Sequence, residues 1–64
     1  MFNKYIKNEF KQLWNCHLDD IVRLGKSKYK VVVSPKSKWR NALQNIKNGK
    51  VIERDAFTYV EILQ

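Results

Sequence analysis

The stretch that decides the fold runs from Ile21 to Pro35 and reads IVRLGKSKYKVVVSP. Two short apolar runs, Ile21–Leu24 and Tyr29–Val33, flank a glycine-containing segment, which is a pattern typical of a β-hairpin. Ser34 and Pro35 then mark a boundary, because serine suits an N-cap and proline suits the first position of a helix. The sequence therefore predicts a hairpin followed by a helix.

Apolar residues before the hairpin recur at helical spacing, with polar residues on the opposite side. They are Phe2, Tyr5, Ile6, Phe10, Leu13 and Trp14. This pattern predicts an amphipathic N-terminal helix that ends near Cys16 or His17. Residues 18–24 fit either the first strand of the hairpin or a continuation of this helix with Gly25 as its C-terminal cap.

Beyond Pro35, apolar residues again fall at i, i+3, i+4 and i+7: Trp39, Ala42, Leu43 and Ile46. They predict a helix over residues 35–48, which Asn48 and Gly49 end. Residues 51–63 are rich in β-branched and aromatic side chains and predict strand, with Asp55 and Ala56 as either a turn within a hairpin or a bulge in one strand.

These elements make a single small α+β domain over residues 1–64, in the order α-β-β-α-β-β, with a small antiparallel sheet. A chain of 64 residues buries only about 60% of the surface that its unfolded state exposes. With one cysteine and one histidine, oligomerisation is the available route to added stability. We therefore expect a homodimer.

The formal net charge of +7 is concentrated in the middle of the chain. Residues 1–22 and residues 41–64 each balance three basic side chains against three acidic ones, whereas residues 23–40 hold seven basic side chains and no acid. The seven are Arg23, Lys26, Lys28, Lys30, Lys36, Lys38 and Arg40. Such a run indicates a polyanionic partner, of which nucleic acid is the commonest.

Strand alternation would place Lys28 and Lys30 on one face of the second hairpin strand, with Lys26 in the adjoining turn. Tyr29 would face the core from the other side. The three lysines form a basic ladder that suits phosphate contacts, although a solvated face that keeps a small protein soluble has the same pattern.

The expected helix start adds a second candidate site. Lys36 and Lys38 would lie in its first turn, where the helix dipole disfavours an exposed cation by about 0.3–1 kcal/mol. A bound phosphate would make the position of the two lysines favourable. Free backbone N–H groups, the hydroxyls of Ser34 and Ser37 and the two lysines could all converge on it. We therefore expect a phosphate contact at this turn.

Trp39 and Arg40 close the basic segment. The guanidinium of Arg40 could pair with a phosphate or with a guanine edge. The apolar stripe favours a core position for Trp39, with a stacking platform for an unpaired base as the alternative. The candidate nucleic-acid-binding residues are thus Lys26, Lys28, Lys30, Ser34, Lys36, Ser37, Lys38 and Arg40, with Arg23 and Trp39 as further candidates.

Catalytic and metal-binding signatures are missing from the sequence. One histidine and six scattered carboxylates do not provide an acid/base set, and there is no glycine-rich phosphate loop or CxxC motif. Cys16 and His17 alone cannot complete a four-ligand zinc site. We expect no enzyme, no metal and no cofactor, with Cys16 packed and His17 facing solvent.

No run of about 18 apolar residues is present, and the first ten residues alternate polar and apolar types, unlike a signal peptide. With its one unpaired cysteine the protein is expected to be cytoplasmic. The small size and the asparagine- and lysine-rich composition resemble small accessory proteins of AT-rich bacteria and their phages. That resemblance implies a regulatory or inhibitory binder, in the host cytoplasm if it is phage-encoded.

The leading functional hypothesis is a small nucleic-acid-binding protein that mainly contacts the phosphate backbone. RNA is favoured over DNA, because a β-ribbon beside a helix start is a surface rather than a groove-inserted helix; a winged-helix DNA binder is the nearest variant. The alternative is a phage-type inhibitor or antitoxin that covers an acidic site on a host enzyme, with or without RNA in the complex. Membrane-surface binding through the N-terminal helix comes third, because its polar side carries only three lysines and one glutamate.

Overall fold

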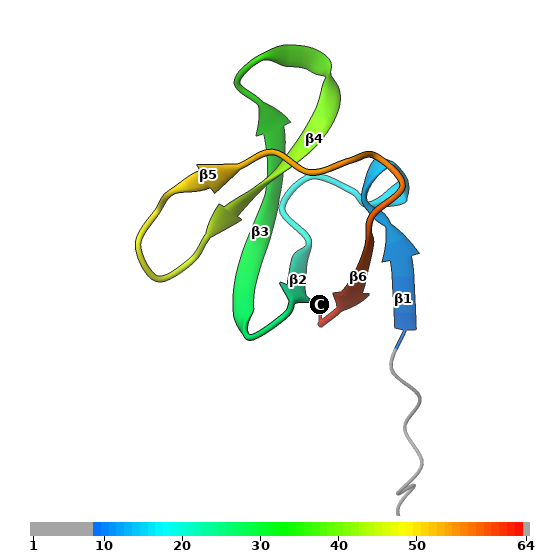
Figure 1. Ribbon diagram of the computed structural model, residues 1–64, viewed down its shortest axis with the longest axis vertical. Coiled ribbons are helices and arrows are strands. Elements are labelled where there is room, and N and C mark those ends of the chain that lie inside the picture. Colours follow the sequence, from blue (N-terminus) through cyan, green and yellow to red (C-terminus); the bar gives the residue numbers. More distant parts are fainter. Residues whose placement is uncertain (1–8, 64) are drawn as a thin grey trace, which may run out of the picture.

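The computed structural model describes residues 9–63, and this part of the chain forms a single antiparallel sheet of six strands (Figure 1). The order of strands across the sheet is β1-β6-β2-β3-β4-β5. The elements are β1 (Glu9–Gln12), the 3₁₀ turn η1 (Leu13–Asn15), β2 (Ile21–Leu24), β3 (Ser27–Ser34), β4 (Ser37–Asn45), β5 (Val51–Ile52) and β6 (Tyr59–Ile62).

The predicted α+β class is wrong, since the described residues contain no α-helix. Residues 1–8 lie outside the described range, and the part of the expected N-terminal helix that follows them is β1 and η1. The expected helix over residues 35–48 is the turn after β3, strand β4 and the turn after β4. With no helix longer than one turn, residues 9–63 contain none that is long and apolar enough to cross a membrane.

The apolar residues between positions 39 and 46 gave a wrong helix prediction, because two adjacent residues of β4, Ala42 and Leu43, are buried on opposite faces of the sheet. Leu43 points into the core, and its neighbour Ala42 is also fully buried although it faces the other side of the sheet. The β4–β5 ladder ends at the pair of Leu43 with Ile52, so that Glu53, which follows β5, lies one register step further on, toward Ala42. Two adjacent buried residues in a strand imitate the i+3, i+4 pair of a helix.

The predicted hairpin is confirmed. Residues 21–24 are strand, and β2 pairs with β3 so that Leu24 stands opposite Ser27 and two residues form the turn. Gly25 occupies the first turn position with φ of 66°, which only glycine adopts without strain and which is typical of a type II′ turn.

The β3–β4 hairpin contains the main irregularity of the sheet. Its ladder pairs Tyr29 with Asn45 and keeps one register as far as Val33 and Asn41, but the next pair is Ser34 with Ser37. Three residues of β4, from position 38 to position 40, therefore have no partner on β3. Pro35 begins a two-residue turn instead of a helix.

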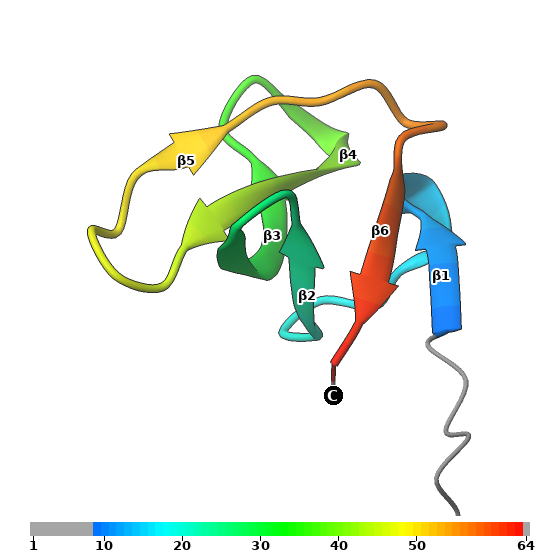
Figure 2. The same ribbon diagram turned by 60° about the horizontal axis from the view of Figure 1, so that its bottom comes forward.

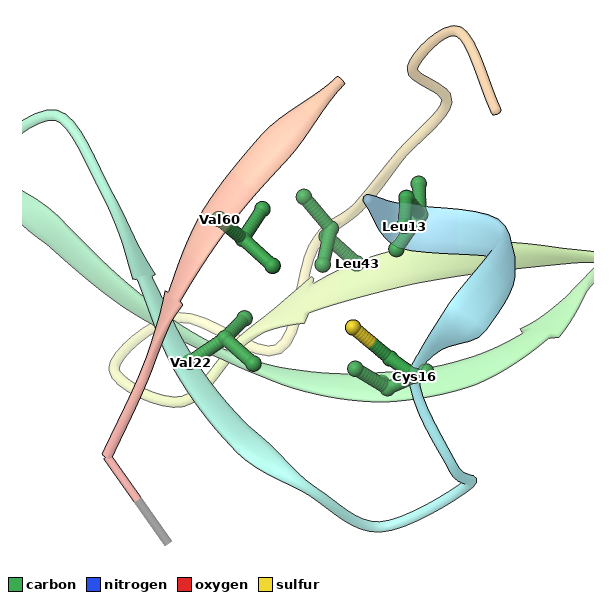
Figure 3. Packing of buried hydrophobic residues seen from close by; sticks show 6 residues of the cluster. Leu13, Cys16, Val22, Leu43 and Val60 are labelled. Atoms are coloured by element: carbon green, nitrogen blue, oxygen red, sulfur yellow. The ribbon is translucent and has the colours of Figure 1, made fainter. Parts of the chain in front are cut away.

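A small core lies between the sheet and the segment that follows β1 (Figure 3). Its members are Leu13, Cys16, Val22, Val31, Leu43 and Val60, with Leu24, Tyr29, Ile52 and Ile62 packed against them. Cys16 and Tyr29 thus face inward as predicted. The amide of Asn41 donates to the carbonyl oxygens of Leu13 and Cys16, at 2.9 and 3.0 Å, and so fixes η1 against β4.

The connection from β5 to β6 passes across one end of the sheet (Figure 2). Its backbone is tied to η1, because the N–H groups of Leu13 and Trp14 donate to the carbonyls of Thr58 and Ala56. Asp55 begins a turn, with its carboxylate accepting from the N–H of Phe57. A turn is present at this position, but the strands on either side of it pair with other strands, so neither the expected hairpin nor the expected bulge forms.

Candidate nucleic-acid interface

Five of the seven basic residues of the central segment belong to the two ends of strand β3, whose place in the sheet Figure 1 shows. Lys36, Lys38 and Arg40 belong to the end where β3 turns into β4, whereas Lys26 and Lys28 lie at the β2–β3 turn. Ser34 lies six residue steps along β3 from Lys28, a length of about 20 Å at the usual rise of a strand. One run in the sequence therefore becomes two basic regions in the structure.

The first region is the aromatic bulge, defined as Lys38, Trp39 and Arg40. These are the three β4 residues that the register leaves without a partner on β3, and all three are exposed. The side chain of Trp39 is 91% exposed, so the predicted core position of Trp39 is wrong. Bulges redirect side chains at functional sites, and this one presents an indole between two cations.

Ser34 holds the turn in place next to the bulge. It is 5% exposed, and its hydroxyl donates to Oε2 of Glu53 at 2.7 Å while accepting from the N–H of Lys36 at 3.0 Å. The hydroxyl of Ser37 accepts from the N–H of Trp39. Both hydroxyls thus support the turn. Because no helix begins at Pro35, the helix-dipole argument for a phosphate at Ser34 and Ser37 no longer applies.

A cavity of about 80 Å³ lies beside the bulge. Its walls are Leu13, Trp14, Trp39, Arg40, Asn41 and Ala56. Trp14 is exposed, and its indole N–H donates to Oε1 of Gln12 at 3.0 Å, which fixes the orientation of the ring. Phe57, next to Ala56, is exposed as well. The bulge therefore belongs to an aromatic surface.

The second region is the lysine groove, defined as Lys26, Lys28, Lys30 and Lys47 around Ile46. Two adjoining cavities of about 320 and 300 Å³ share Asn45 and Ile46, and the four lysines line one or the other. The remaining lining residues are Ser27, Gln44 and Gly49, so the walls hold no acidic side chain. The apolar side chain of Ile46 is exposed in their midst.

Lys47 was not among the residues that the sequence indicated, because it lies in the charge-balanced third of the chain. It reaches the groove through the turn after β4. The side-chain oxygen of Asn45 accepts from the N–H groups of Lys47 and Asn48, at 2.7 and 3.1 Å, and Gly49 completes the turn with φ of 75°. The order Asn45, Asn48, Gly49 is a turn signal that points to this site.

Arg23, by contrast, is neutralised by an acidic partner. Its Nε and Nη2 both donate to Oε1 of Glu61, at 3.0 and 2.7 Å, and the two residues stand side by side on β2 and β6. Glu61 is only 8% exposed and needs this partner to offset its desolvation. Arg23 therefore stabilises the sheet and adds little positive charge to the basic surface.

We expect the Cys16 thiol to react slowly with a water-soluble disulfide reagent. Burial raises the pKa of this thiol and the carboxylate of Asp20 raises it further, while Lys11 lowers it. A raised pKa keeps the thiol protonated and unreactive at neutral pH. The folded protein should react far more slowly than the protein in urea, and equal rates would contradict the packing of Cys16.

Since the pKa of the Cys16 thiol is higher in the folded protein than in the unfolded chain, the thiol's contribution to stability is complete at neutral pH and declines at alkaline pH.

His17 is exposed, as predicted, and its backbone N–H donates to the carboxylate of Asp20 at 2.9 Å. Within residues 9–63, no three side chains of the His, Cys, Asp and Glu types come together as a metal site.

Residues 9–63 form a small antiparallel β-domain with an exposed aromatic bulge at one end of its longest hairpin and a lysine groove at the other. Comparison with known protein families, characterised proteins and solved structures finds no match. Its function is therefore inferred from its own residues.

Proposed function

We propose that this protein binds single-stranded nucleic acid, with RNA favoured over DNA. The observation that carries the proposal is the side chain of Trp39, 91% exposed between Lys38 and Arg40 on the bulge that interrupts the β3–β4 ladder. Proteins that bind single strands combine exposed aromatic rings, on which bases stack, with cations that contact the backbone. The aromatic bulge has both parts within three residues.

RNA is favoured because the basic groups lie on strands and turns. Sequence-independent contacts to a duplex need a surface that follows a groove, and reading base edges in DNA commonly uses a helix in the major groove. A β-surface with an exposed ring suits unpaired bases that can be splayed out, which are the usual target in RNA.

The test is a titration of single- and double-stranded RNA and DNA at two salt concentrations. We expect single-stranded RNA to bind most tightly, with affinity that falls as salt rises. Lys38→Glu should weaken binding and reduce the salt slope by about one per lost contact. Lys11→Glu on β1 changes the net charge equally and should have the smaller effect.

Two results would overturn the proposal. In the first, the protein binds none of the four nucleic acids at low salt. In the second, Lys38→Glu and Lys11→Glu weaken binding equally, as expected for a general attraction between a basic protein and any polyanion.

A second candidate function is a protein inhibitor that covers an acidic site on a host enzyme. The exposed aromatic side chains Trp14, Trp39 and Phe57 favour it, because aromatic groups are enriched at protein interfaces. Such an inhibitor would bind no nucleic acid in the titration, yet would co-purify with one protein in a salt-sensitive complex.

A further inference from the structure

We infer that the aromatic bulge and the lysine groove bind the same strand of nucleic acid, which crosses the outer face of β3 and β4 between them. This inference rests on the proposed function and specifies its ligand: a single strand long enough to reach both sites. The two sites lie at opposite ends of one hairpin, about 20 Å apart along β3.

The face between the two sites suits such a path. Strand alternation puts Lys30 and Val32 of β3 on the side away from the core, opposite Gln44 and Ala42 of β4. These four side chains include a cation and an amide but no acid. The backbone of a strand would thus meet lysines at one end, Lys30 and Gln44 in the middle and cations again at the bulge.

Glu53 is the acidic residue that borders this face, one register step beyond the last β4–β5 pair. Its carboxylate accepts the hydroxyl of Ser34 at 2.7 Å and is half-buried. The hydrogen bond brings this carboxylate to the end of β3, beside the turn that leads into the aromatic bulge, where the Ser34 hydroxyl occupies one of its oxygens. A strand that follows Lys28 and Lys30 along β3 passes beside Glu53 before it reaches the cations of the bulge.

Two contacts on one ligand have a measurable consequence. Once the first site is occupied, the second binds at a high effective concentration, so that a strand spanning both sites binds far more tightly than a strand that reaches one. Affinity should then rise in a step at the oligomer length that first reaches both sites. A row of independent contacts would instead give a smooth increase with length.

The experiment is a series of oligouridines from about three to about twelve nucleotides, which brackets the short end of known single-strand site sizes. We expect at least about a tenfold step in affinity within the series. Lys28→Glu/Lys30→Glu should abolish the step, and the loss of affinity should be much larger for the longest oligomers than for the shortest. Lys28→Gln/Lys30→Gln separates loss of the contact from added repulsion, and circular dichroism checks that each variant is folded.

The outcomes distinguish the inference from the proposed function. If no oligomer binds, the proposed function fails. If oligomers bind but affinity rises smoothly with length, or the groove variants weaken every length equally, the single-strand path is wrong while the proposed function stands. A step that disappears in both groove variants supports the path.

Discussion

Replacing Trp39 with alanine is expected to lower the affinity for single-stranded RNA by about 5- to 150-fold, which corresponds to the roughly 1–3 kcal/mol that one base–aromatic stack contributes. Because the side chain is 91% exposed, its loss opens no cavity in the core. The free energy of unfolding should change by less than about 0.5 kcal/mol, as for most surface substitutions. Fluorescence anisotropy with labelled RNA and a urea titration measure the two quantities.

Matched variants make the interpretation specific. Trp39→Tyr keeps an aromatic ring and should retain most of the affinity, while Phe57→Ala removes another exposed ring and should have less effect. In a Trp14→Phe background, Trp39 is the remaining tryptophan, and stacking on a base should quench its fluorescence. Wild-type affinity in Trp39→Ala would show that the cations alone bind the strand and would remove the role of the indole.

The central hairpin could be predicted because its signals are local. Gly25 supplies the positive φ of the turn, and apolar runs on both sides of it supply the paired strands. Within β3, alternation correctly set Tyr29 and Val31 against the core and Lys28 on the other face. Each of these inferences depended on residues within a few positions of one another.

Strand β4 could not be predicted because its pattern depends on distant residues. Ala42 is fully buried although it faces the side of the sheet opposite to Leu43, and the exposure of Trp39 follows from a register shift between Val33 and Ser34 of the partner strand. In the same way, η1 is held by Asn41, 28 positions away from the Leu13 carbonyl that it contacts. The spacing of apolar residues in β4 is also the spacing of one helix face, and it contains no information about the partner strand. It therefore predicts a helix.

In the candidate site, too, local features could be predicted from the sequence and contacts between distant residues could not. The lysines of β3 were found by alternation, but the ion pair that occupies Arg23 joins residues 38 positions apart. Lys47 enters the lysine groove because β4 brings its far end beside the β2–β3 turn, where the N–H of Ile46 donates to the carbonyl of Lys28 at 3.2 Å. Charge counted along the chain cannot show which cations have partners or which ones meet across a sheet.

Replacing Leu13 with alanine is expected to destabilise the fold by about 2–5 kcal/mol, the usual cost of truncating a buried leucine. Leu13 is fully buried and packs in the same cluster as Val22, Leu43 and Val60 (Figure 3). A domain of 64 residues has a total stability of roughly 3–10 kcal/mol, so this single change should remove a large part of it. The measurement is the midpoint of urea unfolding.

Leu18→Ala is the matched control, since it deletes the same atoms from an exposed side chain and should shift the midpoint little. Leu13→Met nearly conserves the volume and should recover most of the stability, which keeps the test decisive if Leu13→Ala does not fold at all. Equal midpoints for Leu13→Ala and Leu18→Ala would mean that η1 does not close the core. The sheet would then expose Leu43 and Val60 on that side, because Leu13 is the leucine that η1 contributes to their cluster.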